Sequence, residues 1–269
     1  MSPLSLALSL VLVVLSGLYT SLWGAFKDCP YERFKPATFP RSIYFSIAIF
    51  IALYLLPFFR ADLQALSLFQ LFFLVMGVER FLAELYKGFF RTEDQSKYFV
   101  PSRITFFGRH VASNGLRYLV GAVLVLLVFA SMTLQVRVVP FWGFLATAYA
   151  TGLLVSLGGA YKDAPFEGFK PLKFQRSGAV LALLSPLFYS LSNPLVPLPL
   201  GFLIYMNGGL ERFAIEYYKT YIQRHMSGKF RPDLPRQQAF ADTREKFHYL
   251  ALVLIAGLIL LYLHERALL

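Results

Sequence analysis

The stretch GAFKDCPYERFKPATFPRS at residues 24–42 recurs as GAYKDAPFEGFKPLKFQRS at residues 159–177. The two copies share 12 of 19 residues at a separation of 135. A second pair, GVERFLAELYK at 77–87 and GLERFAIEYYK at 209–219, shares 7 of 11 residues at a separation of 132. Nearly equal separations indicate that the chain repeats one ancestral unit. We therefore predict two units, residues 1–135 and residues 136–269.

The composition is that of an integral membrane protein. Of the 269 residues, 57% are apolar and only 15% are charged, which is too apolar for an ordinary soluble domain. Crossing a bilayer takes an apolar helix of about 17–20 residues. Eight runs meet this length, namely 3–23, 43–59, 66–87, 118–134, 138–159, 178–195, 197–218 and 247–263. The first lacks the basic start and the cleavage site of a signal peptide, so we expect it to be retained.

We predict an all-α integral membrane fold of about eight transmembrane helices in two tandem four-helix repeats. Each repeat crosses the membrane an even number of times, so both have the same orientation about an axis along the membrane normal. Of the 26 Lys and Arg residues, all but Arg60, Arg137 and Arg266 fall at the end that carries the motifs. The positive-inside rule places that end in the cytoplasm and both termini outside, in what we expect to be a bacterial inner membrane.

Two segments between apolar runs, 92–117 and 220–246, are strongly basic. Their cations suit anionic lipid headgroups, and they would serve equally well as simple determinants of topology. The basic residues are Lys97, Arg103, Arg109, Arg117, Arg224, Lys229, Arg231, Arg236, Arg244 and Lys246.

A polar stripe ends the third and the seventh apolar runs. The same residue types recur at i, i+4 and i+7, which stacks them on one helical face. The stripe consists of Arg80, Glu84 and Lys87 in the first unit and of Arg212, Glu216 and Lys219 in the second, with Glu79 and Glu211 beside it. The apolar residues around the stripe differ between the units, whereas its polar residues do not.

An ionisable side chain in hydrocarbon costs about 2.5–3.5 kcal/mol, so such groups face the bundle interior and have partners. We predict the pairs Arg80–Glu84 and Arg212–Glu216, and we expect the two pairs to face each other across a polar cavity. The alternative is a helix that leaves the bilayer, with its charges paired within the helix and its Lys reaching to the interface.

The 19-residue repeats supply a second set of polar residues just beyond an apolar run. Each repeat has a Lys-Asp pair, a Pro and a Glu, and an Arg begins the next helix. Because Pro fixes its own backbone and lacks a donor, we expect both segments to be rigid and non-helical. Their cations would bind phosphate while their carboxylates orient them or act as acid and base, although a stiff connector would look the same. The residues are Lys27, Asp28, Glu32 and Arg41, and Lys162, Asp163, Glu167 and Arg176.

The sequence contains no signature of thiol, metal-dependent or phosphate-loop chemistry. Cys29 is the single cysteine and Ala164 replaces it in the second repeat, which excludes an internal disulfide and a thiol nucleophile shared by both units. The four His residues lack metal-ligand spacing, and no Gly-rich phosphate loop is present. We expect no metal, no cofactor and no nucleic acid. Membrane lipids, above all an anionic phospholipid, are the expected partners.

The segment GLERFAIEYYK, and to a lesser degree GVERFLAELYK, resembles the late transmembrane signature of the prolipoprotein diacylglyceryl transferase family. That signature has the form Gly-x-x-Arg-Phe-x-x-Glu, and its Arg and Glu are implicated in handling phosphatidylglycerol. The resemblance implies such a role for Arg212 and Glu216 and, through the repeat, for Arg80 and Glu84.

Two classes of function remain. The first is a lipid or headgroup transferase acting on an anionic phospholipid or a lipid-linked phosphate, in which an Arg clamps phosphate and a Glu is the general base. The second is a transporter or lipid-moving protein with a polar pathway between its repeats, and a lipid-binding subunit of a membrane complex is a third possibility. The catalytic candidates are Arg80, Glu84, Arg212 and Glu216, and the substrate-binding candidates are Lys27, Asp28, Glu32, Arg41, Glu79, Lys87, Lys162, Asp163, Glu167, Arg176, Glu211 and Lys219. An enzyme needs one site, so its two halves should differ, whereas a pathway on the axis needs both stripes about equally.

Overall fold

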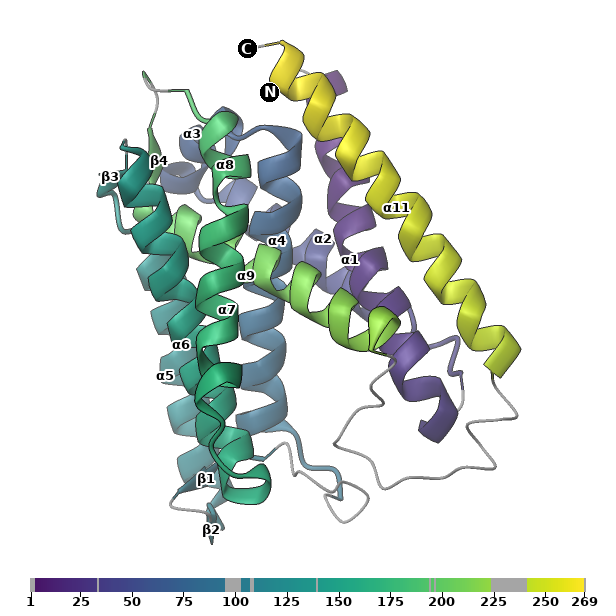
Figure 1. Cartoon of the computed structure of the whole chain (residues 1–269). Coiled ribbons are helices and arrows are strands. Elements are labelled where there is room, and N and C mark those ends of the chain that lie inside the picture. Colours follow the sequence, from purple (N-terminus) through teal and green to yellow (C-terminus); the bar gives the residue numbers. More distant parts are fainter. Residues whose placement is uncertain are drawn as a thin grey trace.

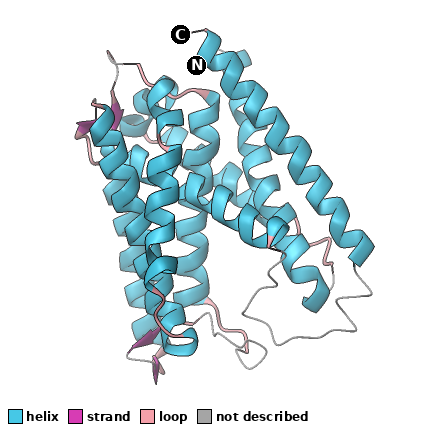
Figure 2. Cartoon of the chain, in the orientation of Figure 1, coloured by secondary structure: helices cyan, strands magenta, loops and turns pink. Residues whose placement is uncertain are grey.

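The structure is a computed structural model that describes residues 3–32, 34–94, 103–106, 109–138, 140–193, 195, 197–223 and 241–268. Helices make up most of it (Figure 2). The first half contains α1 (Pro3–Glu32), α2 (Arg41–Leu55), α3 (Pro57–Ala65), α4 (Leu68–Leu85), the π-helical turn η1 (Tyr86–Phe90), β1 (Thr105–Phe106), β2 (Arg109–His110) and α5 (Asn114–Met132). The second half contains β3 (Arg137–Val138), α6 (Phe141–Glu167), α7 (Pro171–Leu184), α8 (Pro186–Ser190), β4 (Leu198–Pro199), α9 (Leu200–Tyr217), the π-helical turn η2 (Tyr218–Ile222) and α11 (Ala241–Ala267).

All eight apolar runs of the sequence are helical over most of their length. Four helices of the described chain, α1, α5, α6 and α11, are long and apolar enough to cross a membrane. A fifth span results if α2 and α3, which meet at an angle of 109°, count as one broken span. These helices fit a membrane location. The prediction of eight spans is not confirmed, because α4 and α9 carry three charged residues each near their ends.

The helix boundaries follow local chemistry. Pro57 occupies the first turn of α3, where its missing N–H matters least, and it forces Leu56 into an extended conformation that ends α2. Ser67 begins α4 with a capping box, in which its side chain accepts from the Gln70 backbone and the Gln70 side chain accepts from the Ser67 backbone. Pro186 begins α8 directly after Ser185, which keeps a helical conformation between α7 and α8.

Figure 1 places both chain termini and the β3–β4 pair at one end of the molecule, and α1 and α6 both run from that end toward the other. Helix α9 runs obliquely across the centre and ends beside α1. The three cations that the sequence separates from the rest lie on elements at the terminal end, Arg60 on α3, Arg137 in β3 and Arg266 in the last turn of α11. Arg137 binds Asp62 of α3 there, with 2.7 Å between Nη1 and Oδ1.

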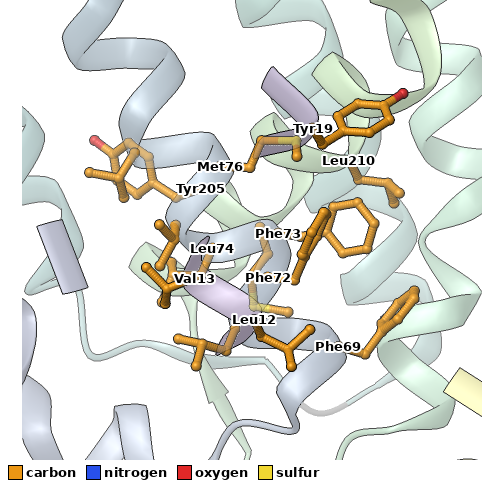
Figure 3. Close-up of a cluster of buried hydrophobic side chains, with 14 of the residues drawn as sticks. Leu12, Val13, Tyr19, Phe69, Phe72, Phe73, Leu74, Met76, Tyr205 and Leu210 are labelled. Carbon is orange, nitrogen blue, oxygen red and sulfur yellow. The ribbon is translucent and has the colours of Figure 1, made fainter. Parts of the chain in front are cut away.

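The centre of the molecule is formed by α4 and α9. Every residue of α4 from position 69 to position 79 is buried, and Figure 3 shows Phe72, Phe73 and Met76 of this helix packed with Tyr19 of α1 and Leu210 of α9. A helix that is apolar on all sides belongs inside a bundle. Glu79 of α4 and Glu211 and Arg212 of α9 are therefore brought into the interior by the helices that carry them.

Candidate functional site at the crossing of α4 and α9

Helices α4 and α9 cross in direct backbone contact. A methyl group added to Gly77 would lie 1.8 Å from the carbonyl oxygen of Tyr205, and one added to Gly209 would lie 2.0 Å from that of Phe73. Only glycine permits such an approach. Gly77 and Gly209 hold the same position in the two motifs, and Phe73 and Tyr205 are also 132 residues apart. The contact is therefore reciprocal.

Two ion pairs join the helices beside this contact. Arg80 of α4 binds Glu211 of α9 through Nη1 and Oε2. Arg212 of α9 binds Glu79 of α4, with 2.8 Å between Nη1 and Oε2. The predicted pairs Arg80–Glu84 and Arg212–Glu216 are wrong, because the glycines bring the helix axes so close that each Arg reaches a carboxylate on the other helix.

Serines at the ends of the 19-residue repeats donate a further hydrogen bond to each of the two carboxylates. Ser42 Oγ donates to Glu79 Oε1 at 3.1 Å, and Ser177 Oγ donates to Glu211 Oε1 at 2.6 Å. Glycines again position the donors, because a methyl group at Gly17 would lie 2.7 Å from the Ser42 carbonyl oxygen and its counterpart at position 152 makes the equivalent contact with Ser177. Neither serine was predicted as a site residue from the sequence, although both recur at the same position of the 19-residue repeat.

The charged residues of the crossing lie in the interior, as predicted. Glu79 is 3% exposed, Glu211 is 2% exposed and Arg212 is 4% exposed. Removing one member of a buried ion pair leaves the other charge uncompensated, which typically costs about 3–5 kcal/mol. Because each of these carboxylates already has an Arg and a Ser as partners, the crossing is first of all a structural lock between α4 and α9.

The second polar cluster lies where α9 ends against α1. Lys27 Nζ of α1 lies 3.2 Å from Glu216 Oε2, and Lys219 Nζ of η2 lies 3.8 Å from Glu216 Oε1. The Trp23 ring lies 5.5 Å from Lys27 Nζ and 5.1 Å from Arg212 Cζ, which is within the range of a cation–π interaction. We call Trp23, Lys27, Arg176, Glu216 and Lys219 the Glu216 cluster.

Arg176 belongs to this cluster through its effect on Lys219. Burial lowers the pKa of the Lys219 ammonium. Glu216 and Glu211 act in the opposite direction, while the positive charges of Lys27 and Arg176 lower the pKa of Lys219 further. Burial and two neighbouring cations thus disfavour the charged form of Lys219.

Among the described residues that the repeat relates to this cluster, Glu84 and Arg41 are more exposed than Glu216 and Arg176. Lys87 Nζ lies 2.9 Å from Glu84 Oε1 on the same helical stretch, and the side chain of Glu84 is 46% exposed. Arg41, the counterpart of Arg176, is exposed at the start of α2. Trp23 has no counterpart, since Gly158 occupies the equivalent position.

The predicted non-helical character of the Lys-Asp-x-Pro-x-Glu segments is wrong. Helix α1 continues to Glu32 and α6 continues to Glu167, so Lys27 and Asp28 lie on a helix. Pro30 lacks the N–H that would bind the carbonyl oxygen of Phe26, and Arg244 Nε of α11 donates to that oxygen at 3.0 Å instead. The side chains of four candidates lie outside the described residues, and they are Glu32, Lys162, Asp163 and Glu167.

The basic segments are described only in part. Lys97, Arg224, Lys229, Arg231 and Arg236 lie outside the described residues.

Arg117, which the sequence analysis assigned to a basic surface, is 1% exposed. Its Nη2 donates to the carbonyl oxygens of Phe89 and Arg91 at 3.0 and 2.8 Å and so holds the end of η1. In the second half, the His248 ring stacks on Tyr221 of η2 with 4.6 Å between centroids. Each half thus secures its π-helical turn with a different side chain, and π-helical turns are frequent at functional sites.

No protein-family model, curated protein or solved structure matches the chain. The chemistry of the two polar clusters is therefore the basis for a function. The crossing pairs are buried and mutually neutralised. The Glu216 cluster lies at the end of a helix and is partly exposed, since the side chains of Lys27, Glu216 and Lys219 are 18%, 16% and 28% exposed, so an anionic group could reach it.

Proposed function

We propose that the protein binds an anionic phospholipid or a lipid-linked phosphate within the membrane and transfers a lipid or headgroup from it, as the resemblance to diacylglyceryl transferases suggests. One observation carries the proposal. Lys27 and Lys219 both contact Glu216 at the end of α9, in a chain with four helices long and apolar enough for a bilayer among its described residues. Cations beside a carboxylate at such a boundary suit a phosphate ester and acid–base chemistry.

The proposed architecture is two tandem four-helix repeats of one orientation, with eight spans and the motif-bearing end in the cytoplasm. The reciprocal contacts support it, because Gly77 with Tyr205 and Gly209 with Phe73 are related by the same separation as the motifs. The parallel course of α1 and α6 in Figure 1 supports a common orientation. The segregation of all but three cations toward one end supports the sidedness.

In the proposed transfer, Glu216 takes the proton of an acceptor while the lone pair of that acceptor forms a bond to the lipid carbon next to the phosphate ester. The carbon–oxygen bond breaks and the phosphate leaves with the electron pair. Lys27 and Lys219 stabilise the charged form of Glu216 in the absence of substrate. A phosphate that draws these cations to itself leaves Glu216 more able to accept a proton.

A transporter remains the second candidate, because the reciprocal ion pairs at the crossing have the symmetry that a pathway on the axis would use. Opening such a pathway would separate α4 from α9 at Gly77 and Gly209, where the backbones touch. It would also break the two buried ion pairs. The free energy needed to separate the helices and break these ion pairs favours a transferase over a transporter.

The test combines lipid binding with lipid turnover. Purified protein incubated with phosphatidylglycerol or phosphatidylcholine is examined by native mass spectrometry, and lipid extracts of cells expressing the wild type, Glu216→Gln or Glu84→Gln are compared. We expect preferential retention of phosphatidylglycerol and loss of one lipid product in Glu216→Gln alone. Equal loss in both variants would favour the transporter. Unchanged lipid profiles would contradict both functions.

A further inference from the structure

Two hydrogen-bond donors in the Glu216 cluster lack an acceptor. Trp23 Nε1 and Arg176 Nε are buried, and neither bonds to any acceptor among the residues that the structure describes. Buried donors are nearly always satisfied by protein or ordered solvent, so each exception calls for an explanation. Both of these groups can only donate, and an acceptor ligand would satisfy them.

These donors adjoin the charged centre of the cluster from two sides. The Trp23 ring of α1 lies against Lys27. Arg176 of α7 directly precedes Ser177, whose hydroxyl donates to Glu211 of α9 at 2.6 Å. Glu216 lies between the two lysines and contacts both, and the Trp23 and Arg176 donors remain without an acceptor among the described residues. An anion with several acceptor oxygens would satisfy these donors and bind the lysines.

A phosphate group has that chemistry. A guanidinium offers phosphate a planar fork of donors, and an ammonium offers a compact charge with three donors. The indole N–H adds one directional donor without charge. The phosphate could belong to a lipid headgroup or to a free phosphate ester, because the oxygens that bind are the same in both.

The described residues related to this site by the repeat lack this combination. Gly158 replaces Trp23 and has open space around it, since a methyl group there would meet no atom within 4 Å. Arg41 replaces Arg176 and is exposed. Lys87 replaces Lys219 and pairs with Glu84, whose side chain is 46% exposed. The ends of α4 and α9 keep the same motif, but the indole donor and the buried Arg176 donor adjoin it only at the end of α9 among the described residues.

We propose that Trp23, Lys27, Arg176 and Lys219 form a phosphate-binding site at the end of α9, and that the residues related to them by the repeat do not form one at the end of α4. This inference rests on the proposed function and assigns the substrate phosphate to the end of α9. Trp23 and Arg176 orient the phosphate from α1 and α7. Lys27 and Lys219 exchange their contact with Glu216 for contact with the phosphate.

The experiment uses matched substitutions in the two halves of the full-length protein in detergent. Arg176→Gln is compared with Arg41→Gln, and Lys219→Gln with Lys87→Gln. Binding of inorganic phosphate and of glycerol 3-phosphate is measured by isothermal titration calorimetry. We expect Arg176→Gln and Lys219→Gln to weaken binding about tenfold or more, as loss of a charged hydrogen bond does. The two first-half variants should change the Kd by less than about twofold.

Trp23→Phe keeps an aromatic ring and removes the N–H donor, so it should weaken phosphate binding without unfolding the protein, as checked by thermal unfolding. Equal losses in the two halves, or no measurable phosphate binding by the wild type, would overturn the site. Competition by phosphatidylglycerol micelles against glycerol 3-phosphate would identify a lipid as the source of the phosphate, and the absence of competition would identify a free ester.

The outcome for the site is separable from the outcome for the transferase. Half-specific phosphate binding in a protein with no lipid turnover would support the site and remove the proposed transfer reaction. Lipid turnover that survives Arg176→Gln and Lys219→Gln unchanged would keep the reaction and overturn the site.

Discussion

The two helix ends beyond the crossing carry the same motif in different surroundings. At the end of α9, Glu216 is partly buried and Lys27 reaches it from α1. At the end of α4, Glu84 is 46% exposed and pairs with Lys87 three residues further along. The Gly and Glu-Arg positions of the motif, by contrast, make equivalent contacts in both halves. The motif therefore has two separable roles, a crossing that both copies form and a proposed site at the end of α9, where Lys27 of α1 meets Glu216.

The largest difference between the halves should appear when an Arg of the crossing is removed. Arg212→Ala leaves Glu79 buried without its cation, and we expect a loss of about 3–5 kcal/mol in the free energy of unfolding. Arg80→Ala should cost less, about 1–3 kcal/mol, because the Arg80 side chain is 20% exposed and water already screens its attraction to Glu211. Unfolding in SDS–detergent mixtures measures both values. Equal losses would show that exposure does not distinguish the two pairs.

Arg212→Lys sharpens this comparison. Lys preserves the charge opposite Glu79 but not the planar fork, so we expect it to recover part of the stability lost in Arg212→Ala. If Arg212 also contacts a substrate phosphate, Arg212→Lys should reduce lipid turnover by more than its stability explains.

The glycines of the crossing should behave alike in the two halves. Gly77→Ala and Gly209→Ala each push a methyl group into a backbone carbonyl, and we expect a similar loss of about 3 kcal/mol from each. Gly24→Ala is the matched control, because a methyl group there meets nothing within 4 Å and Ala favours a helix. The same unfolding assay reports all three. A loss in one crossing variant alone would contradict the reciprocal contact.

The sequence was informative where structure depends on local pattern. The apolar runs predicted the helices, and the recurring polar stripe predicted buried charge, because both signals repeat along the chain. The partner of each Arg was not predictable from spacing within one helix, since the choice of Glu211 for Arg80 depends on an approach between helices that Gly77 permits. Trp23 was not predicted because the candidate residues were chosen for their recurrence in both repeats, and Trp23 does not recur.

The extent of α1 was mispredicted because a distant residue compensates a local defect. Pro30 would ordinarily end the helix by leaving the carbonyl oxygen of Phe26 without its donor. Arg244 supplies that donor from α11, which lies more than 200 residues away in the chain. The sequence around Pro30 contains no pattern from which this contact could be predicted.

The serines should rank the two carboxylates, Glu79 and Glu211, in the opposite order to the arginines. Ser177 donates to Glu211 at 2.6 Å in a buried position, whereas Ser42 donates to Glu79 at 3.1 Å in a part-buried one. Ser177→Ala should therefore cost about 1.5 kcal/mol and Ser42→Ala less. The same unfolding assay measures both, with Ser→Cys at each position as a control that keeps the volume. If Ser42→Ala proved the more costly change, Glu211 would have to be satisfied mainly by Arg80.

The smallest expected effects concern the two lysines of the motif, and they should differ in sign. Burial lowers the pKa of Lys219, and Lys27 and Arg176 lower it further, so its charge is unfavourable in the folded state. Lys219→Met should then raise stability by up to about 1 kcal/mol, as replacement of a strained functional residue often does. Lys87→Met removes a half-exposed pair with Glu84 and should lower stability by about 0.3–0.5 kcal/mol.

The pH dependence provides an independent measurement of the Lys219 effect. A lysine whose pKa is lower in the folded than in the unfolded state binds more protons when unfolded, so stability rises with pH between the two values. For Lys219 this window lies below its ordinary value of 10.5. The wild type should therefore gain stability over Lys219→Met as the pH rises through the alkaline range, whereas Lys87→Met should follow the wild type. A Lys219→Met curve parallel to that of the wild type would mean that the cluster does not disfavour this charge, and it would remove the physical reason for expecting an anion there.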